Sequence, residues 1–298
     1  MKKVFITGAT GFVGGHLKNH LTGRGYEVFS ATRNDLGDPF SVEAWRKALE
    51  KAECETVVHL IAKTHAADAG DPSALPSYRH INVDITKALL EASQNLGVKK
   101  FIYLSSIKAV GEETSIDEPF TEESPCRPED CYGISKREAE ELILEYSRSI
   151  NTIILRPPLI YGRGVKGNFS KLLNAVKRGI PLPFASVQNA RSLLYIGNLT
   201  KAIECILRQP FTGTAIFHVA DRKSPSTPEL IQTMATVLNV RLRMQPFPPF
   251  LLEVMASLAG KGETVKKLTR SLVVSITEME NKLNYSPSIS LLEGLKDS

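Results

Sequence analysis

The chain begins with a short apolar strand that passes at once into a glycine-rich turn and then a helix. The strand is Val4–Thr7, and Gly8, Gly11 and Gly14 follow it at the spacing GxxGxxG. Glycine tolerates the backbone conformations of a tight turn, and a helix that begins there points backbone N–H groups and the positive end of its dipole at one spot. This order of elements is typical of a parallel sheet that binds the pyrophosphate of a dinucleotide.

Strand-like and helix-like segments alternate over the first half of the chain. We expect strands at 3–7, 27–32, 56–60, 101–105 and 152–155, and helices at 11–23, 42–51, 81–96 and from Tyr132 to about 149. This alternation predicts an α/β fold, a Rossmann-like doubly wound parallel sheet with right-handed crossovers. Past Pro157 prolines cluster, strands shorten and helices such as 198–208 and 228–238 dominate. We therefore expect a dinucleotide-binding domain at 1–156 and a smaller α+β substrate-binding lobe at 157–298, interleaved with it.

Composition excludes several classes of protein. With 298 residues, 42% hydrophobic and 23% charged, the chain is long enough to bury a large core, and its net charge of +5 includes no long run of like charges, so nucleic acid is not an expected partner. The four cysteines show no metal-ligand spacing, which favours reduced thiols, a cytoplasmic location and no metal. The apolar stretch 250–259 is too short to span a bilayer, so we expect a core or interface helix there.

The end of the second predicted strand bears on the choice of dinucleotide. Enzymes that use the unphosphorylated cofactor usually place an acidic residue there to accept from the ribose hydroxyl, whereas this chain has Thr32, Arg33 and Asn34. A guanidinium fork suits a 2′-phosphate, so Arg33 favours NADP(H), with NAD(H) possible. The alternative is an exposed loop arginine without a ligand.

Tyr132 and Lys136 form the second informative pattern, since YxxxK puts a phenol and an ammonium on one face of a helix. We expect Lys136 to lower the pKa of Tyr132 and to reach the cofactor ribose. The predicted strand at 101–105 ends at Ser105, and Ser106 follows it, at the edge where ligands of open parallel sheets bind. We assign Ser106 as the hydroxyl that orients the substrate, with Ser105 as the alternative, so the predicted catalytic residues are Ser106, Tyr132 and Lys136.

These motifs, with HLIA, YLSSIKAVG, LRPPLIYGRG and the closing KLNYSP and LEGL, resemble the extended short-chain dehydrogenase/reductase family over nearly the whole chain. Within it the chain is similar to the NAD-dependent epimerase/dehydratase branch that acts on nucleotide sugars. The resemblance implies a UDP-sugar substrate, a homodimer formed through the Tyr132 helix, and two sets of binding residues. The cofactor set is Gly8, Thr10, Gly11, Phe12, Val13, Gly14, Arg33, Leu60, Ala62, Tyr132, Lys136 and Pro158. The substrate set is Ser106, Lys108, Asn168, Phe184 and Arg191.

Departures from the family pattern narrow the expected chemistry. Sugar 4,6-dehydratases place an Asp-Glu pair directly after the catalytic hydroxyl, but this chain has Ile107 and Lys108. Hexose 4-epimerases usually carry an asparagine in the segment where this chain reads Arg156, Pro157 and Pro158. The segment 33–42 is also short and leaves little room for the usual third strand.

We therefore expect an NAD(P)-dependent oxidoreductase that reduces the 4-keto group of a UDP-6-deoxy-N-acetylhexosamine. The close alternative is a UDP-sugar 4-epimerase that retains NAD. A more distant alternative is a non-catalytic dinucleotide sensor, although such proteins commonly lose the tyrosine or the lysine, and fold alone does not decide between these functions.

Overall fold

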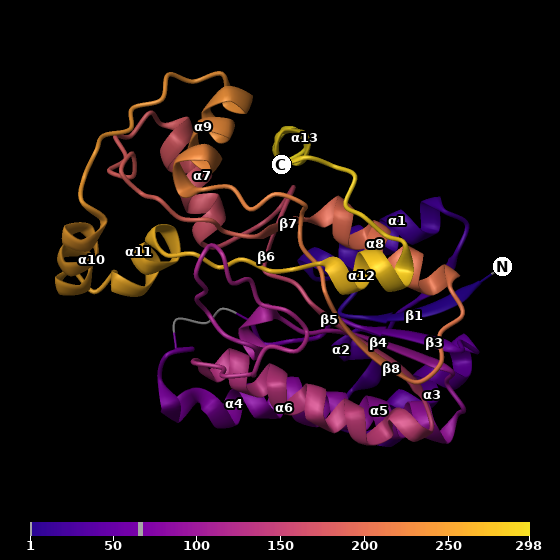
Figure 1. Ribbon diagram of the computed structural model, residues 1–298. Helices are drawn as coiled ribbons and strands as arrows, with labels where there is room; N and C mark the ends of the chain where they lie inside the picture. The colour runs from indigo at the N-terminus through magenta and orange to yellow at the C-terminus, as the bar shows by residue number, and fades with distance from the viewer. Residues whose placement is uncertain (1, 65–67) are drawn as a thin grey trace.

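A computed structural model describes residues 2–64 and 68–298, and it is built around one parallel six-stranded sheet (Figure 1). The strand order is β2-β1-β3-β4-β5-β8. The strands are β1 Lys3–Thr7, β2 Glu27–Phe29, β3 Thr56–His59, β4 Lys100–Leu104, β5 Asn151–Arg156 and β8 Thr214–His218. Because the chain leaves β1 toward β2 on one side and returns to β3 on the other, the sheet has a switch point between β1 and β3, where ligands of such folds bind.

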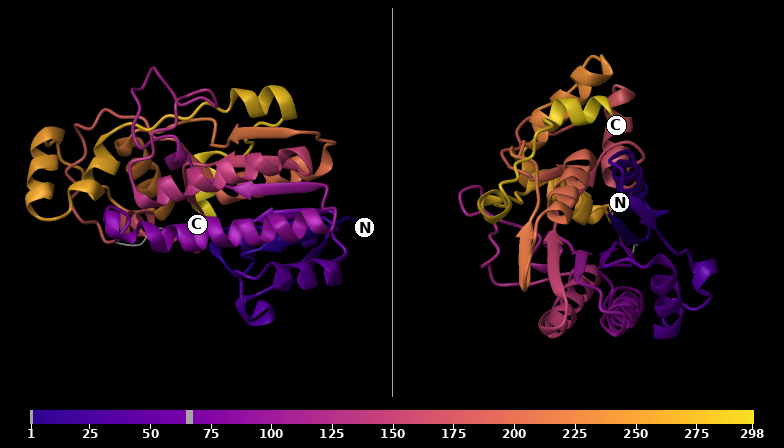
Figure 2. Two further views of the ribbon diagram at one scale, coloured as in Figure 1. Left: turned by 90° about the horizontal axis from the view of Figure 1, so that it is seen from below. Right: turned by 90° about the vertical axis from the view of Figure 1, so that its right-hand side faces the viewer.

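Helices cover both faces of this sheet, because side chains of buried parallel strands alternate between two apolar layers (Figures 1 and 2). In β1, Phe5 packs into one layer, whereas Val4 and Ile6 pack into the other. The Phe5 layer is covered by α3 Val42–Ala52, α5 Ile85–Asn95 and α6 Cys131–Glu145. The opposite layer is covered by α1 Phe12–Gly23, α8 Ile196–Arg208 and α12 Thr277–Leu283.

The remaining elements lie mostly in the C-terminal half and project beyond the sheet (Figure 1). A second, two-stranded parallel sheet joins β6 Leu159–Tyr161 to β7 Leu193–Tyr195. The other helices are α2 Arg33–Leu36, α4 Leu75–Arg79, α7 Asn168–Lys177, α9 Thr227–Leu238, α10 Pro249–Leu258, α11 Gly262–Thr269 and α13 Leu291–Lys296. In the described part of the chain, no helix is both long enough and apolar enough to cross a membrane.

The predicted α/β class and the doubly wound parallel sheet are confirmed. The short segment after β2 forms the one-turn helix α2, and in chain order the described residues form no further strand before β3. β2 ends at Phe29, earlier than the predicted Thr32. The sequence prediction did not include β8, an edge strand, although Ala215, Ile216 and Phe217 form an apolar run within it. The division of the chain at residue 156 stays a prediction.

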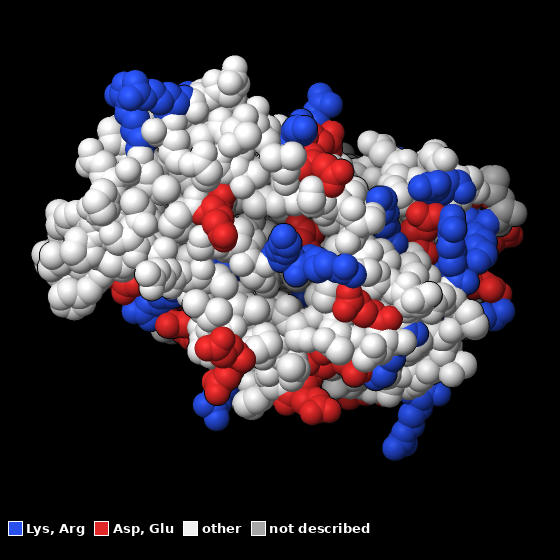
Figure 3. Space-filling model, turned by 45° about the horizontal axis from the view of Figure 1, so that its top comes forward, with Lys and Arg blue, Asp and Glu red and all other residues white. Residues whose placement is uncertain are grey.

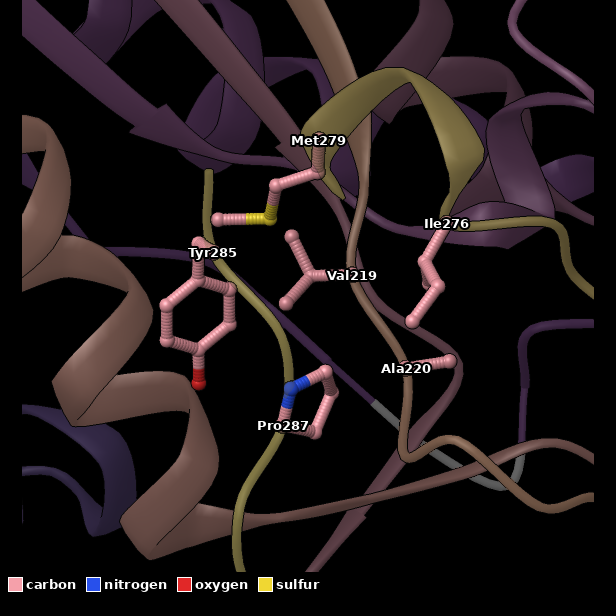
Figure 4. A pocket seen from close by; sticks show the side chains of 6 residues that line it. All are labelled: Val219, Ala220, Ile276, Met279, Tyr285 and Pro287. Carbon is pink, nitrogen blue, oxygen red and sulfur yellow. The ribbon is translucent and has the colours of Figure 1, made fainter. Parts of the chain in front are cut away.

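The C-terminal segment folds back onto the end of β8 (Figure 4). Val219 and Ala220, which follow β8, face Ile276 and Met279 at the start of α12 across a small hollow that Tyr285 and Pro287 close. The Tyr285 hydroxyl donates a hydrogen bond of 2.6 Å to the backbone oxygen of Asn198 in α8. Apolar packing and this hydrogen bond attach the last part of the chain to the sheet.

Candidate active site

The glycine turn after β1 has the geometry that its sequence predicts. Gly8 has a φ of +68°, a value that favours glycine, and a Cβ on Gly14 would lie 2.1 Å from the Gly8 oxygen. Gly11 caps α1 without a side-chain hydrogen bond, and the first turn of α1 has no acidic residue. The N-terminus of α1 is therefore suited to an anion, and the turn allows a close approach of the backbone.

The other predicted cofactor residues surround this turn. Thr10 is exposed, whereas Phe12 and Val13 are partly buried at the start of α1. Leu60 follows β3 directly beside the turn, since a Cβ on Gly8 would lie 3.1 Å from the Leu60 carbonyl carbon. Ala62 lies two residues further along the same segment. The glycine turn and the end of β3 thus meet at the switch point of the sheet.

Arg33 lies at the first position of α2, close after the end of β2, and is exposed. Its neighbour Asp35 is used locally, because its carboxylate accepts hydrogen bonds from the backbone N–H (2.7 Å) and the hydroxyl of Thr32 and completes a capping box. The two residues that directly follow β2 are Ser30 and Ala31. The strand end therefore carries no carboxylate of its own, and the first charged side chain after it in the sequence is the Arg33 guanidinium.

Ser105 and Ser106 follow β4 but have different surroundings. The Ser105 hydroxyl is buried and donates to Glu140, which also forms a buried ion pair with Arg156, with an Nη2–Oε2 distance of 2.7 Å. Ser106 is partly exposed, and its hydroxyl hydrogen-bonds with Tyr132. Ser106 is thus the serine in contact with Tyr132, whereas the Ser105 hydroxyl is engaged by Glu140, and the catalytic role of Ser106 stays a prediction.

Tyr132 reaches Ser106 because the next residue is glycine. A Cβ on Gly133 would lie 2.4 Å from the Lys108 backbone oxygen, so only glycine lets the start of α6 pack this closely against the turn after β4. Burial raises the pKa of Tyr132, which is 7% exposed, and the hydrogen bond with Ser106 opposes this effect. The phenol is therefore protonated at neutral pH.

Lys136 lies on the same face of α6 as Tyr132, but its ammonium group contacts other residues. Its ammonium donates to the Leu104 oxygen (2.6 Å) and lies 4.0 Å from the centre of the Tyr103 ring. Burial lowers the pKa of Lys136 to about 7, and Glu140 opposes that shift. The prediction that Lys136 lowers the pKa of Tyr132 is wrong for this structure, because burial governs the pKa values of both side chains.

Two buried polar groups beneath the site were not predicted. Asn82, in a π-helical turn before α5, donates to the Ser135 hydroxyl (2.8 Å) and accepts from the Lys63 N–H (2.7 Å), so it ties α6 to the segment after β3. His59 bonds to Thr7 at 2.7 Å and Thr86 at 2.9 Å, and burial lowers its pKa to about 3. The histidine of HLIA is thus a neutral link between strands and α5, and the motif alone does not reveal its partners.

Lys108 lies in a cluster of charges at the mouth of the site. Its ammonium contacts Asp130 at 2.5 Å and Glu112 at 2.7 Å. Burial lowers the pKa of Lys108, but the two carboxylates outweigh it and raise this pKa overall. Asp130 also caps α6 by accepting from the Gly133 N–H at 2.8 Å. An aspartate ahead of a helix is a recognisable capping signal, whereas nothing in the sequence pairs Lys108 with Asp130.

The remaining predicted site residues have different environments. Pro158 is buried between β5 and β6, and Asn168 is exposed at the first position of α7. Phe184 is 6% exposed and packs in the apolar core, so its stacking on a base stays a prediction without support from its surroundings. Arg191 is partly buried and donates to the Arg270 oxygen (3.0 Å), and burial lowers its pKa to about 10 while Glu112 and Glu113 oppose this. Substrate contacts of all five predicted residues stay predictions.

A parallel sheet with a glycine turn at its switch point, beside a Tyr–Lys helix, defines a nicotinamide-dependent enzyme of the extended short-chain dehydrogenase/reductase class. The profile of the NAD dependent epimerase/dehydratase family matches residues 4–220, and the chain belongs to this family.

Known relatives include both epimerases and reductases. The chain is 36% identical to a UDP-glucose 4-epimerase of Vibrio cholerae, over all of this chain and 94% of that protein. It is 26% identical to a GDP-6-deoxy-D-mannose reductase of Pseudomonas aeruginosa, over 83% of this chain and 84% of that one. The fold is similar to that of RMD from Pseudomonas aeruginosa complexed with NADPH, with a TM-score of 0.80, 21% identity, and coverage of 100% and 97% of the two chains. The protein is thus an enzyme of the epimerase/reductase type that acts on nucleotide sugars.

Proposed function

We propose that the protein reduces the 4-keto group of a UDP-linked 6-deoxy-N-acetylhexosamine with NADPH. The observation that carries this proposal is Arg33, an exposed guanidinium just after β2, where Ser30 and Ala31 offer no carboxylate to a ribose hydroxyl. Preference for the phosphorylated cofactor favours a reductase, since a reductant that is exchanged at each turnover in biosynthesis is usually NADPH. Lys108, in place of an acidic residue after Ser106, argues against dehydration.

The catalytic roles follow from the contacts of three side chains. When bound, the reduced nicotinamide supplies a hydride to carbon 4 of the sugar. Tyr132, kept protonated by burial, donates the proton to the carbonyl oxygen, and Ser106, its hydrogen-bond partner, holds that oxygen. Lys136 lies one helical turn from Tyr132 and is assigned to the ribose of the cofactor. Arg191 is assigned to the diphosphate, because a planar fork of donors in a partly buried site suits phosphate oxygens.

A UDP-sugar 4-epimerase is the second candidate, and the 36% identity to the Vibrio cholerae protein over the full chain favours it. An epimerase would use the same residues, oxidise carbon 4 and return the hydride to the opposite face, with NAD retained throughout. The two reactions therefore differ in whether the cofactor is consumed.

One pair of incubations separates the candidates. Purified protein is supplied with UDP-4-keto-6-deoxy-N-acetylglucosamine and NADPH, and in parallel with UDP-N-acetylglucosamine without added cofactor. Consumption of NADPH in the first supports reduction, and formation of a 4-epimer in the second supports epimerisation. Tyr132→Phe serves as the inactive control in both. If neither reaction occurs, the reductase proposal is rejected and binding of the cofactor is measured to test the sensor alternative.

Arg33→Gln tests the observation on which the proposal depends. If Arg33 binds the 2′-phosphate, this variant loses affinity for NADPH by roughly tenfold or more, the loss of a charge-assisted hydrogen bond, while its affinity for NADH changes little. An equal loss for both cofactors would contradict the assignment. Lys18→Gln, an exposed change on α1, is the matched control.

The proposal includes three further predictions. The first is that residues 1–156 bind the cofactor and residues 157–298 bind the sugar. The second is that two chains form a dimer through α6. The third is that the enzyme works in the cytoplasm. Limited proteolysis, light scattering and cell fractionation test these in turn.

A further inference from the structure

Helix α10 exposes an apolar face that no other described element covers. Phe250, Leu251, Val254, Met255 and Leu258 are between 43% and 87% exposed, and they recur at the spacing of one helical face. Among the described residues, they are five of the nine exposed large apolar side chains. Figures 1 and 2 both place α10 at the outer end of the C-terminal half, away from the six-stranded sheet. A contiguous apolar surface of this kind normally marks an interaction site.

The surroundings of α10 are basic. Residues 239–270 carry six Lys or Arg and two Asp or Glu, a net charge of +4, whereas the whole chain has a net charge of +5. We call these residues the basic segment. Arg241, Arg243 and Lys261 are exposed. Figure 3 shows the end of the molecule around α10 as a broad uncharged surface with charged side chains at its borders. Residues 239–270, which include α10, therefore carry nearly all of the net positive charge of the protein.

A groove between α10 and α11 combines both properties. Its volume is about 530 Å³, and Phe250, Val254 and Leu258 line one side while Lys266 and Arg270 stand at the other. Apolar walls beside ammonium and guanidinium groups suit a molecule with a hydrocarbon part and an anionic head. Lys266 is paired with Glu263 and Arg270 with Glu253 at the protein surface, where ion pairs are weak and exchange readily with other anions.

We propose that α10 and the basic segment form a docking surface for an anionic lipid bilayer, with the apolar face of α10 at the boundary of headgroups and acyl chains. A second copy of the chain fits less well. A two-fold contact through α10 would set one basic segment against another, and the like charges would repel. The bilayer supplies both an apolar layer and the negative charge that the segment lacks.

The surface is connected to the candidate active site through a short series of ion pairs. Arg270, at the end of α11, pairs with Glu253 of α10 at 3.0 Å and with Glu113 at 2.8 Å. The neighbouring Glu112 pairs with Lys108, two residues after Ser106. Docking through α10 therefore places the mouth of the site near the bilayer surface. The inference itself concerns binding to lipid and does not depend on which sugar is the substrate.

Flotation of the full-length protein with vesicles tests the proposal. We expect it to float with vesicles of phosphatidylcholine and phosphatidylglycerol, to float less with phosphatidylcholine alone, and to be released as salt increases. The double variant Phe250→Glu with Leu258→Glu should bind at least about tenfold more weakly, because two apolar side chains no longer enter the bilayer. The matched control, Ile116→Glu with Ile180→Glu, changes two exposed apolar residues elsewhere and should bind like the unmodified protein.

A second set of variants tests the charge. Arg241→Gln, Arg243→Gln and Lys261→Gln should each weaken binding to anionic vesicles by about fivefold, and turnover of soluble substrate should not change in any of these variants. Absence of flotation with anionic vesicles overturns the proposal. Equal binding by the Phe250/Leu258 variant also overturns it. If light scattering shows instead that this double variant halves the mass of the protein, the surface is an interface between two copies and the lipid proposal is wrong.

Discussion

Two ion pairs flank Tyr132 and Lys136 along α6, one just before the outer, N-terminal end of the helix and one further in beside β5, and the two pairs have opposite surroundings. At the inner end Glu140 and Arg156 are both fully buried, with Ser105 as a further partner of Glu140. At the outer end Asp130 pairs with Lys108, and both side chains keep about a seventh of their surface exposed. Tyr132 and Lys136 lie between them. If the outer pair at the mouth of the site opens, water or a ligand can stabilise the separated charges. If the inner pair in the core opens, neither can reach them.

This difference assigns separate tasks to the two pairs. The inner pair fixes α6 against β5, because water cannot reach that position to stabilise a charge that has lost its partner. The outer pair keeps some contact with water, so it can open toward a bound ligand at a smaller cost than the inner pair. We therefore expect changes at the inner end to reduce stability and changes at the outer end to reduce substrate affinity, with the largest effect on catalysis between them.

The largest effect is expected at Tyr132. Tyr132→Phe removes the proton donor and should lower kcat by about 10²–10⁴-fold, the usual contribution of a positioned general acid. Its free energy of unfolding should change by only about 1 kcal/mol, the net value of one hydrogen bond. Steady-state kinetics and urea denaturation check the two expectations. A variant within about threefold of the original kcat would show that another group donates the proton.

Glu140→Gln should destabilise the protein by about 3–5 kcal/mol, because it leaves the Arg156 charge buried without its partner. Glu141→Gln, the same change on the exposed side of α6, should cost less than about 1 kcal/mol. Urea denaturation compares the two variants. Equal effects would mean that the inner pair does not fix the helix.

The buried ammonium between the two pairs should make stability depend on pH. Burial lowers the pKa of Lys136 to about 7 in the folded protein, so the unfolded chain holds one more proton between pH 7 and the ordinary lysine range. Stability should therefore rise with pH across that window, by at most about 1.4 kcal/mol per pH unit, and this contribution levels off below pH 7.

Lys136→Met removes this contribution, so the measurement is the difference in unfolding free energy between variant and original protein as pH rises from 6 to 10. Lys18→Met, an exposed lysine on α1, should leave the pH dependence unchanged. A constant difference for Lys136→Met across the range would refute a titrating buried lysine.

A smaller effect, mainly on substrate affinity, is expected at Lys108. Lys108→Gln should destabilise the protein by only about 1 kcal/mol, because the carboxylates it leaves are partly hydrated. KM for the sugar nucleotide should nevertheless rise by roughly tenfold if Lys108 turns to the substrate. Lys99→Gln, which removes an exposed pair with Glu55, is the control for stability. An unchanged KM with reduced stability would make the outer pair purely structural.

The sequence by itself determined the sheet, the glycine turn and the helix that carries Tyr132 and Lys136. Each depends on local rules, because the period of apolar residues sets a strand or a helix, and glycine is required where Gly8 has a positive φ and where Gly14 meets the Gly8 oxygen. The serine that contacts Tyr132 was also predictable, since the carboxyl end of β4 must lie at the ligand-binding edge of the sheet.

Only the tertiary structure decided which distant side chains meet. Three contacts join residues that are far apart in the chain. His59 links Thr7 to Thr86, Lys108 pairs with Asp130, and β8 adds to the sheet beside β5. The expected lowering of the Tyr132 pKa by Lys136 was wrong for the same reason, since burial is set by all the neighbours of a side chain and helical spacing reports only those one turn away.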